Sequence, residues 1–448
     1  MSATALEPPL APQRTAVRRR LIFLLWLVAL ISLGELAIVG PIGNDVSQYW
    51  SAIRSVKSRA SPYAGSIAAL RAYHNRPTRA AGDHAPLIFW YPPLAIPLLR
   101  MLSLSPSWLA GALYFVALAA AFLLQLRAGY LMATEKDRGW LVFLLPFAAF
   151  FPGLLADQSI LCGNIAYLLY GLLLTAAISG WKQNKWLWFY LAVVFASIFK
   201  PQMMPLLAFP VLTGRRQWAP ASVAGAVSCL LFAIQPFIWP DRFLEFLLTV
   251  HLATDWSHDF GFGPSGVLSQ SLCTMNKPYS PANIFFYLAW AAALGALMLA
   301  IRRLVDSHPH LREKWIPLAL VGAVLLSPRI KEYDTAALTV PMLLIAWNAL
   351  LQGQEWLAQW KAKRVFGPAR QNTERAALGP RRGNAHGLGL ILLGSGCFAT
   401  CNVIDILWGD WVPTELLLLL LVFSAGLCAL WSQRTHSPVD YPVADGAP

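Results

Sequence analysis

Asp45 is the chemistry-bearing residue whose position in this chain is most informative. It lies in the segment Gly43 to Trp50, a few residues after the first long apolar run, and it opens a long polar segment. A carboxylate at the outer mouth of a membrane helix is hydrated enough to stay ionised and still lies close to lipid. We therefore expect Asp45 to act as a general base that takes a proton from an acceptor hydroxyl; the alternative is a carboxylate that only marks the end of a helix.

Three basic residues lie in turns that we expect on the same side of the membrane as Asp45. Lys200 comes at the end of an apolar run and directly before Pro201, which breaks a helix. Arg329 and Lys331 lie in the short polar turn 327–334. Charges at this depth are usually paired or functional. Because lysine and arginine side chains bind phosphate oxygens, we expect all three residues to bind a phosphate that leaves the substrate during the reaction. The alternatives are a snorkelling lysine and an ion pair within the turn.

Other polar side chains near the same helix ends are weaker candidates for contacts with a sugar or an acceptor. They are Tyr91, Asp157, Gln158, Asn164, His251 and His258. Asn164 is equally explained as the N-cap of a helix that begins at Ile165. The histidines are too loosely spaced for a metal site, and no CxxC or HExxH pattern exists, so the sequence supports no metal and no cofactor.

Composition predicts the elements that must hold these residues. The chain is 57% hydrophobic and 13% charged, and it contains 19 tryptophans, which favour membrane interfaces. Apolar runs approach the length needed to cross a hydrocarbon core of ~30 Å. The sequence therefore predicts an all-α polytopic membrane protein with about 12 crossings. The runs are Leu21–Gly40, Pro106–Leu126, Trp140–Leu155, Ile165–Gly180, Trp186–Phe199, Gln202–Thr213, Trp218–Trp239, Ile284–Ile301, Trp315–Leu326, Thr335–Leu351, Leu388–Leu407 and Glu415–Trp431.

The first run is too long for a signal peptide, so we expect an uncleaved helix. Tyr91–Leu104 is short and proline-rich, which favours a juxtamembrane or re-entrant element. The expected organisation is a cytoplasmic tail (1–20), a membrane module (21–351) with two large outer loops (41–88 and 240–283), a basic cytoplasmic loop (352–387), a C-terminal helix pair (388–431) and a cytoplasmic tail (432–448).

The net charge of +13 is explained mainly by topology. With both termini in the cytoplasm, Lys and Arg concentrate in the inner loops, as the positive-inside rule requires. We therefore expect anionic lipids, and no nucleic acid, as partners. Cys162 and Cys273 both map to the outer side; we expect free thiols there, with a disulfide as the alternative.

The order of several short motifs resembles glycosyltransferase family 87, also described as the DUF2029 family, which has the GT-C fold. The motifs are Asp45 to Tyr49, Ser61-Pro62-Tyr63, Trp90 to Leu94, Cys162 to Ile165, Phe199-Lys200-Pro201 and Leu326-Ser327-Pro328. Two of them depart from the family pattern. Gly163-Asn164 lacks the usual glutamine, and the turn after Pro328 lacks the more common aromatic and histidine residues.

The resemblance implies an inverting hexosyltransferase of the cell inner membrane. Its donor would be a polyprenyl-phosphate sugar, with mannose the first candidate, and its acceptor a lipid or glycan on the extracytoplasmic face. Asp45 aligns with the catalytic aspartate of the family, and Lys200 with the lysine that faces the donor phosphate. Two alternatives remain: a polymerase or ligase of lipid-linked oligosaccharides, and a transporter or flippase, which would need paired ionisable residues near the bilayer midplane.

Overall fold

The computed structural model describes residues 44–75, 88–102, 104–134, 137–138, 141, 163–214, 216–257, 263, 281–331, 334, 336–366 and 414–433. Every regular element in these ranges is a helix, as the sequence predicts. Four helical segments are long and apolar enough to cross a membrane: α5 (Ser107–Met132), α7 (Ile165–Gln183), α10 (Trp218–Ala233) with α11 (Gln235–Ile238), and residues Ile284–Ser307 of α14 (Pro281–Ser307). The runs 21–40 and 388–407, and all but one residue of 140–155, lie outside the described residues.

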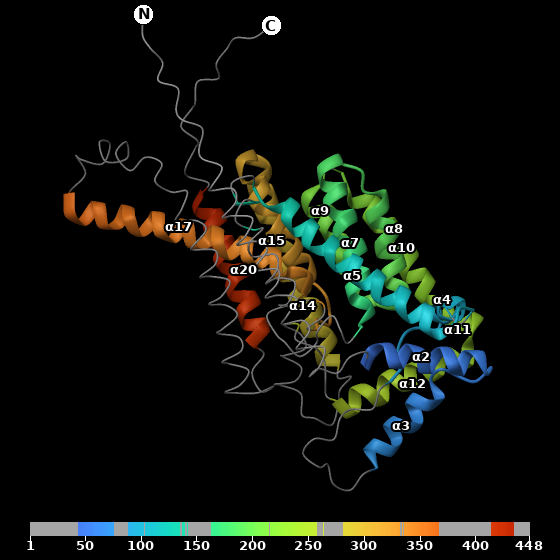
Figure 1. The fold of residues 1–448 in the computed structure, drawn as a ribbon. Helices are drawn as coiled ribbons and strands as arrows, with labels where there is room; N and C mark the ends of the chain where they lie inside the picture. Colours follow the sequence, from blue (N-terminus) through green and yellow to red (C-terminus); the bar gives the residue numbers. More distant parts are fainter. Residues whose placement is uncertain are drawn as a thin grey trace, which may run out of the picture.

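The helices form a bundle around α15 (Arg312–Leu325), as Figure 1 shows. Every residue of α15 from Trp315 to Leu325 is buried, which requires a helix that is apolar on all sides. By contrast, α10 and α14 expose large apolar side chains, among them Val223, Leu230, Phe285 and Leu288. Apolar faces of this extent are unfavourable in water and suit contact with lipid. The chain is therefore a helical membrane protein.

The apolar helices α5 and α7 cross at close range because α7 carries a glycine at the crossing. A Cβ atom on Gly171 would lie 2.6 Å from the backbone oxygen of Ala121 and 2.7 Å from its Cα. Small residues let helix backbones approach closely in membranes. Gly171 therefore sets the distance between two helices that reach the candidate site.

Replacing Gly171 with alanine should lower the stability of the protein by about 1–3 kcal/mol, because the new methyl group meets backbone atoms that cannot rotate away. The thermal midpoint in detergent would measure this loss. Gly353→Ala is the matched control, since a Cβ at position 353 meets nothing within 4 Å. Equal midpoints for the two variants would contradict the close crossing.

The chain leaves the α-helical pattern directly after Lys200. α8 (Leu187–Phe199) is followed by the 3₁₀ helix η3 (Pro201–Leu207) and the short helix α9 (Ala208–Thr213). The sequence predicts a single apolar run over Gln202–Thr213, and the structure divides it in two. Prolines at 201 and 205 lack backbone N–H donors, which favours the short 3₁₀ segment over a regular α-helix.

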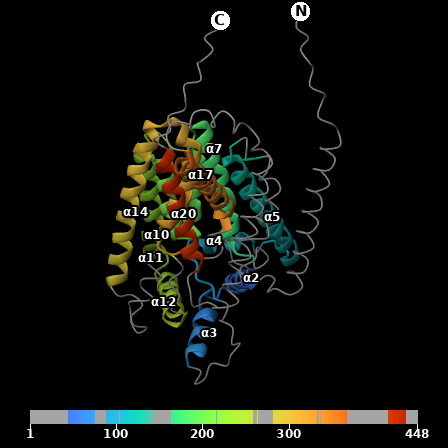
Figure 2. The ribbon, with the colours of Figure 1, turned by 90° about the vertical axis from the view of Figure 1, so that its left-hand side faces the viewer.

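One end of the bundle carries helices that the sequence predicts only as loops. α2 (Asn44–Lys57), α3 (Ala64–His74) and α12 (Pro240–Ser257) lie together there in both views (Figure 1 and Figure 2), with α4 (Ala95–Leu102) beside them. The Ser61 hydroxyl donates to Glu245 of α12, and the rings of Tyr63 and Phe246 lie 6.3 Å apart. These contacts fix α12 against the segment between α2 and α3.

The last helices extend further than the apolar pattern indicates. α17 (Thr339–Phe366) continues past residue 351, so the expected basic loop from 352 begins as a helix. α20 (Thr414–Gln433) packs against α17 and α15. At the end of α20, Gln433 accepts a hydrogen bond from Lys314 at 2.6 Å and donates one to Gln352 at 3.0 Å. These contacts lie at the end of α15 away from α2.

Candidate active site

Asp45 lies in the first turn of α2, where the helix dipole favours a carboxylate. Its side chain is half-buried. Oδ1 accepts a hydrogen bond from Nε2 of Gln48 at 3.0 Å, and Oδ2 accepts one from Nδ2 of Asn164 at 2.8 Å. Two neutral amides therefore hold the carboxylate, and neither amide is itself a base.

Asn164 joins α7 to both Asp45 and Lys200. Its Oδ1 accepts hydrogen bonds from the backbone N–H of Ala166 at 2.9 Å and from Nζ of Lys200 at 3.1 Å. The first bond satisfies one of the free N–H groups at the start of a helix, so the N-cap interpretation is confirmed. Its hydrogen bonds with Asp45 and Lys200 place the same side chain between the proposed base and a cation.

Gly163 allows the start of α7 to approach α2. Its φ is +79°, a conformation that favours glycine. A Cβ atom at this position would lie 2.1 Å from Cγ2 of Val46. The Gly163 carbonyl oxygen accepts a hydrogen bond of 2.6 Å from the Tyr114 hydroxyl of α5. The residue before Asn164 is therefore fixed by α5 and has no room for a side chain.

Lys200 lies between Asn164 and a second carboxyl group, that of Asp334. Lys200 and Asp334 are each only 3% exposed. Burial raises the pKa of Asp334, and the positive charge of Lys200 is the largest influence that opposes this rise. The Lys331 backbone N–H, which donates to Oδ2 of Asp334 at 2.9 Å, and the charge of Arg329 also oppose it. The turn before α17 therefore supplies a buried carboxyl group that interacts electrostatically with the buried lysine.

Arg329 and Lys331 lie in the turn that follows α15. The Ser327 hydroxyl lies 2.9 Å from the carbonyl oxygens of both Gln202 and Arg329, which ties this turn to the start of η3. The guanidinium carbon of Arg329 lies 4.8 Å from the centre of the Trp90 ring, within the range of a cation–π contact. The side chains of Arg329 and Lys331 are half-buried. Because Ser327 joins their turn to the start of η3, all three predicted cations lie at one end of the bundle.

Tyr91, predicted as a sugar or acceptor contact, is buried in an aromatic cluster beside Asp45. Its hydroxyl lies 2.9 Å from that of Tyr49, which in turn accepts a hydrogen bond from the Ile165 backbone N–H at 3.1 Å. The Tyr63 hydroxyl donates to the Tyr91 carbonyl oxygen at 2.6 Å. Burial raises the pKa of Tyr49 well above its ordinary value, so this hydroxyl stays protonated. The cluster positions α2 against the start of α7.

The remaining predicted contacts are not brought to Asp45 by any described interaction. His251 is exposed on α12, which packs against α3. Asp157, Gln158, His258 and both Cys162 and Cys273 lie outside the described residues. Within the described part of the chain, no three His, Cys, Asp or Glu side chains are placed to hold a metal ion.

Three residues of the site are missing from the sequence prediction. Gln48 lies three positions after Asp45, a spacing that places both on one face of a helix, so recognising α2 as a helix would have found it. Gly163 and Asp334 gave weaker signals. Glycine before a helix start is common, and the partners of Asp334 come from other parts of the chain.

Comparison with known proteins gives one match. No curated protein matches the chain, and no solved structure does. The sequence model of glycosyltransferase family 87 matches residues 89–328, more than half of the chain. This range contains Asn164 and Lys200, whereas Asp45 precedes it and Arg329 follows it directly. The chain belongs to glycosyltransferase family 87.

Proposed function

We propose that this glycosyltransferase moves a hexose, with mannose as the first candidate, from a polyprenyl-phosphate donor to a hydroxyl of a lipid or glycan acceptor. The observation that carries the proposal is the half-buried carboxylate of Asp45, held by Asn164, whose amide oxygen also accepts a hydrogen bond from the buried cation of Lys200. A base beside a cation at the end of a membrane bundle suits transfer from a lipid-linked phosphate to a hydroxyl.

The proposed reaction is a single displacement with inversion. Asp45 takes the proton of the acceptor hydroxyl as the acceptor oxygen forms a bond to the anomeric carbon. The bond from that carbon to the phosphate oxygen breaks on the opposite face, and the lipid phosphate leaves with the electron pair. Phosphate needs little protonation to leave, so one carboxylate suffices, unlike the two that glycoside hydrolysis generally uses.

The charge on the departing phosphate requires cations nearby. We assign Arg329 and Lys331 to direct contact with the phosphate, because both are half-buried at the end of the bundle. Lys200 is buried against Asn164, so its charge acts on the phosphate through the low-dielectric interior. The stacking of Arg329 on Trp90 holds the guanidinium in place.

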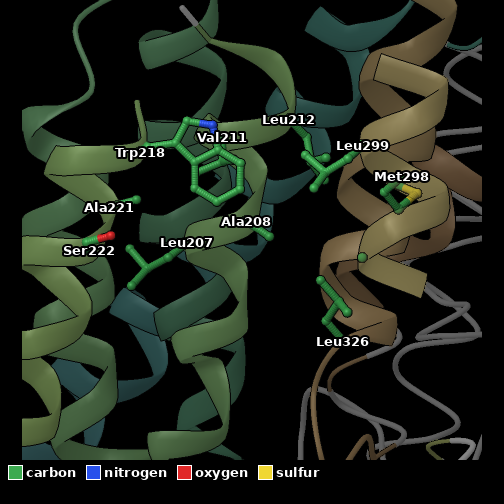
Figure 3. Close-up of a pocket in the computed structure, with 11 residues that line it drawn as sticks. Leu207, Ala208, Val211, Leu212, Trp218, Ala221, Ser222, Met298, Leu299 and Leu326 are labelled. Carbon is green, nitrogen blue, oxygen red and sulfur yellow. The ribbon is translucent and has the colours of Figure 1, made fainter. Parts of the chain in front are cut away.

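An apolar cavity supports a donor with a hydrocarbon carrier. It has a volume of about 260 Å³ and lies between α9, α10 and α14, with Leu207, Trp218, Met298 and Leu326 in its wall (Figure 3). Leu326 directly precedes Ser327, whose hydroxyl contacts the Gln202 carbonyl oxygen two residues after Lys200. A polyprenyl chain in this cavity would therefore have one end near the cation cluster.

The distribution of basic residues supports an extracytoplasmic site in the cell membrane, with both termini in the cytoplasm. The helix ends opposite Asp45 carry Lys182, Lys185, Arg216, Arg302, Arg303, Arg312 and Lys314. Under the positive-inside rule these ends face the cytoplasm and its anionic lipids. The candidate site then faces outward, where polyprenyl-linked sugars are used.

The test is a comparison of donors with the purified protein in lipid vesicles. We expect hexose transfer from polyprenyl-phosphate hexose and none from a nucleotide-diphosphate hexose, measured by radiolabel in the acceptor lipid or glycan fraction. Transfer of a whole glycan from a lipid diphosphate would instead favour a polymerase or ligase. Movement of the labelled lipid across the vesicle without bond cleavage would favour a flippase.

The phosphate assignment has its own control in the same assay. Arg329→Gln should raise the donor KM and leave the acceptor KM nearly unchanged, because the guanidinium is assigned to the donor phosphate. Arg242→Gln is the matched control, since this arginine pairs with Glu245 of α12 at 3.2 Å. An unchanged donor KM in Arg329→Gln would remove Arg329 from the donor site.

A further inference from the structure

We propose that Asn164 is a positioning residue for the base: it links the carboxylate of Asp45 to the buried ammonium group of Lys200 and keeps that carboxylate ionised. This role rests on the proposed function of Asp45 as the base. Asn164 is the N-cap of α7, and its hydrogen bonds to Asp45 and Lys200 support a second role besides capping.

The orientation of the Asn164 amide is fixed because each of its partners can only donate or only accept a hydrogen bond. The Ala166 backbone N–H and the Lys200 ammonium can only donate, so the atom that contacts both must be the carbonyl oxygen. The other end of the amide must then be the NH₂ group, and the Asp45 carboxylate, which only accepts, lies 2.8 Å from it. A rotated amide would lose all three hydrogen bonds.

The side chain is also held in position. Asn164 is 6% exposed, and Gly163 before it has a φ of +79° and packs against Val46. On the far side, Lys200 is 3% exposed and faces Asp334, which is equally buried. A buried ammonium group needs a counter-charge and hydrogen-bond acceptors. Asn164 supplies an acceptor, and the carboxyl group of Asp334 interacts electrostatically with the ammonium group.

The arrangement has a direct consequence for the base. A hydrogen bond donated to a carboxylate favours its ionised form, so the NH₂ group of Asn164 keeps Asp45 ready to accept a proton. Gln48 and Asn164 each donate to one oxygen of the carboxylate, so the two amides together fix the plane of the base. Asn164 itself cannot take the proton, so it positions the base without replacing it.

The described ionisable groups of the candidate site come from several elements, and they belong in the interpretation of a pH profile. They are Tyr49 of α2, Tyr91 before α4, Tyr114 of α5, Lys200 after α8, and Arg329 and Asp334 between α15 and α17. Burial raises the pKa of Tyr49, so this hydroxyl does not titrate in the acid range. The acid limb of the rate profile therefore reports mainly on the carboxyl groups.

The decisive variant is Asn164→Asp, which preserves the shape of the side chain and its acceptor contacts to Ala166 and Lys200. It removes the donor to Asp45 and places a carboxylate oxygen against it. We expect kcat to fall by on the order of 10²-fold and the acid limb of kcat/KM to move up by about one pH unit, with donor KM nearly unchanged. A wild-type kcat and pH profile would overturn the role, as would a loss confined to donor KM, which would identify a sugar contact.

Two further variants keep the test independent of folding. Asn164→Ser retains an N-cap for α7 without adding charge, and we expect the same upward shift of the acid limb with a smaller fall in kcat. Asn184→Asp makes the same chemical change at the opposite, exposed end of α7 and should behave as wild type. An unshifted acid limb in Asn164→Ser would contradict the proposal even if Asn164→Asp did not fold.

The result also separates this role from the proposed function. If Asp45→Asn remained active, the base assignment would be wrong and the positioning role would be lost with it. If Asp45→Asn were inactive and both Asn164 variants kept the wild-type pH profile, only the role of Asn164 would be wrong.

Discussion

Replacing Asp45 with asparagine should lower kcat by about 10²–10⁴-fold, the usual contribution of a general base. The variant has nearly the same shape, but its side chain cannot accept the proton of the acceptor hydroxyl. It also presents an NH₂ group that conflicts with one of the amide donors, Gln48 or Asn164. Initial rates with saturating donor and acceptor would measure the loss, and size-exclusion chromatography and the thermal midpoint would show that the fold is retained.

Asp241→Asn is the matched control for this experiment. Asp241 is exposed in the first turn of α12, a helix that lies at the same end of the bundle as α2. The same chemical change there should leave the rate within about twofold of wild type, since surface substitutions have small effects. Transfer by Asp45→Asn at the rate of this control would show that another group acts as the base.

Gly163→Ala is expected to have the second largest effect. The positive φ costs a residue with a side chain about 1–3 kcal/mol, and the new Cβ would lie 2.1 Å from Cγ2 of Val46. Relief of this overcrowding costs about 1–3 kcal/mol more and separates α2 from the start of α7. Because displacement by about 1 Å can cost 10²-fold in rate, kcat should fall together with the thermal midpoint.

Two comparison variants identify the cause of the Gly163→Ala defect. Gly65→Ala places a methyl group on α3 where nothing lies within 4 Å, and it should be neutral or slightly stabilising. Adding Val46→Ala to Gly163→Ala removes the contacting Cγ2 atom and should restore part of the midpoint. A midpoint that does not rise in the double variant would show that backbone strain alone causes the defect.

Much of the helical framework is predictable because long apolar runs leave few alternatives. The runs that correspond to α5, α7, α8 and α14 lie within a few residues of the observed helices. No such signal marks α2, α3 and α12, whose polar and apolar residues are mixed. These helices are stabilised by contacts with each other and with the bundle end, such as that between Ser61 and Glu245, which local patterns do not contain.

The site is only partly predictable, for a similar reason. Asp45 and Lys200 stand out because ionised groups next to apolar runs are costly without a purpose. The link between them does not stand out, since Asn164 is 119 positions from Asp45 and 36 from Lys200. Its N-cap role is visible in the local sequence, whereas its bonds to Asp45 and Lys200 depend on how α2, α7 and α8 pack.

The long sequence separation within this hydrogen-bonded chain has a consequence for how the protein is made. Ribosomes add about 5–20 residues per second, so Asp45 is synthesised on the order of 10 s before Asn164, and Lys200 and then Asp334 follow later. During that interval the nascent chain carries the carboxylate and the amide of Gln48 without Asn164 or Lys200. The candidate site is therefore assembled late in synthesis, and a chain that ends before the turn after α15 would contain the proposed base without its complete support.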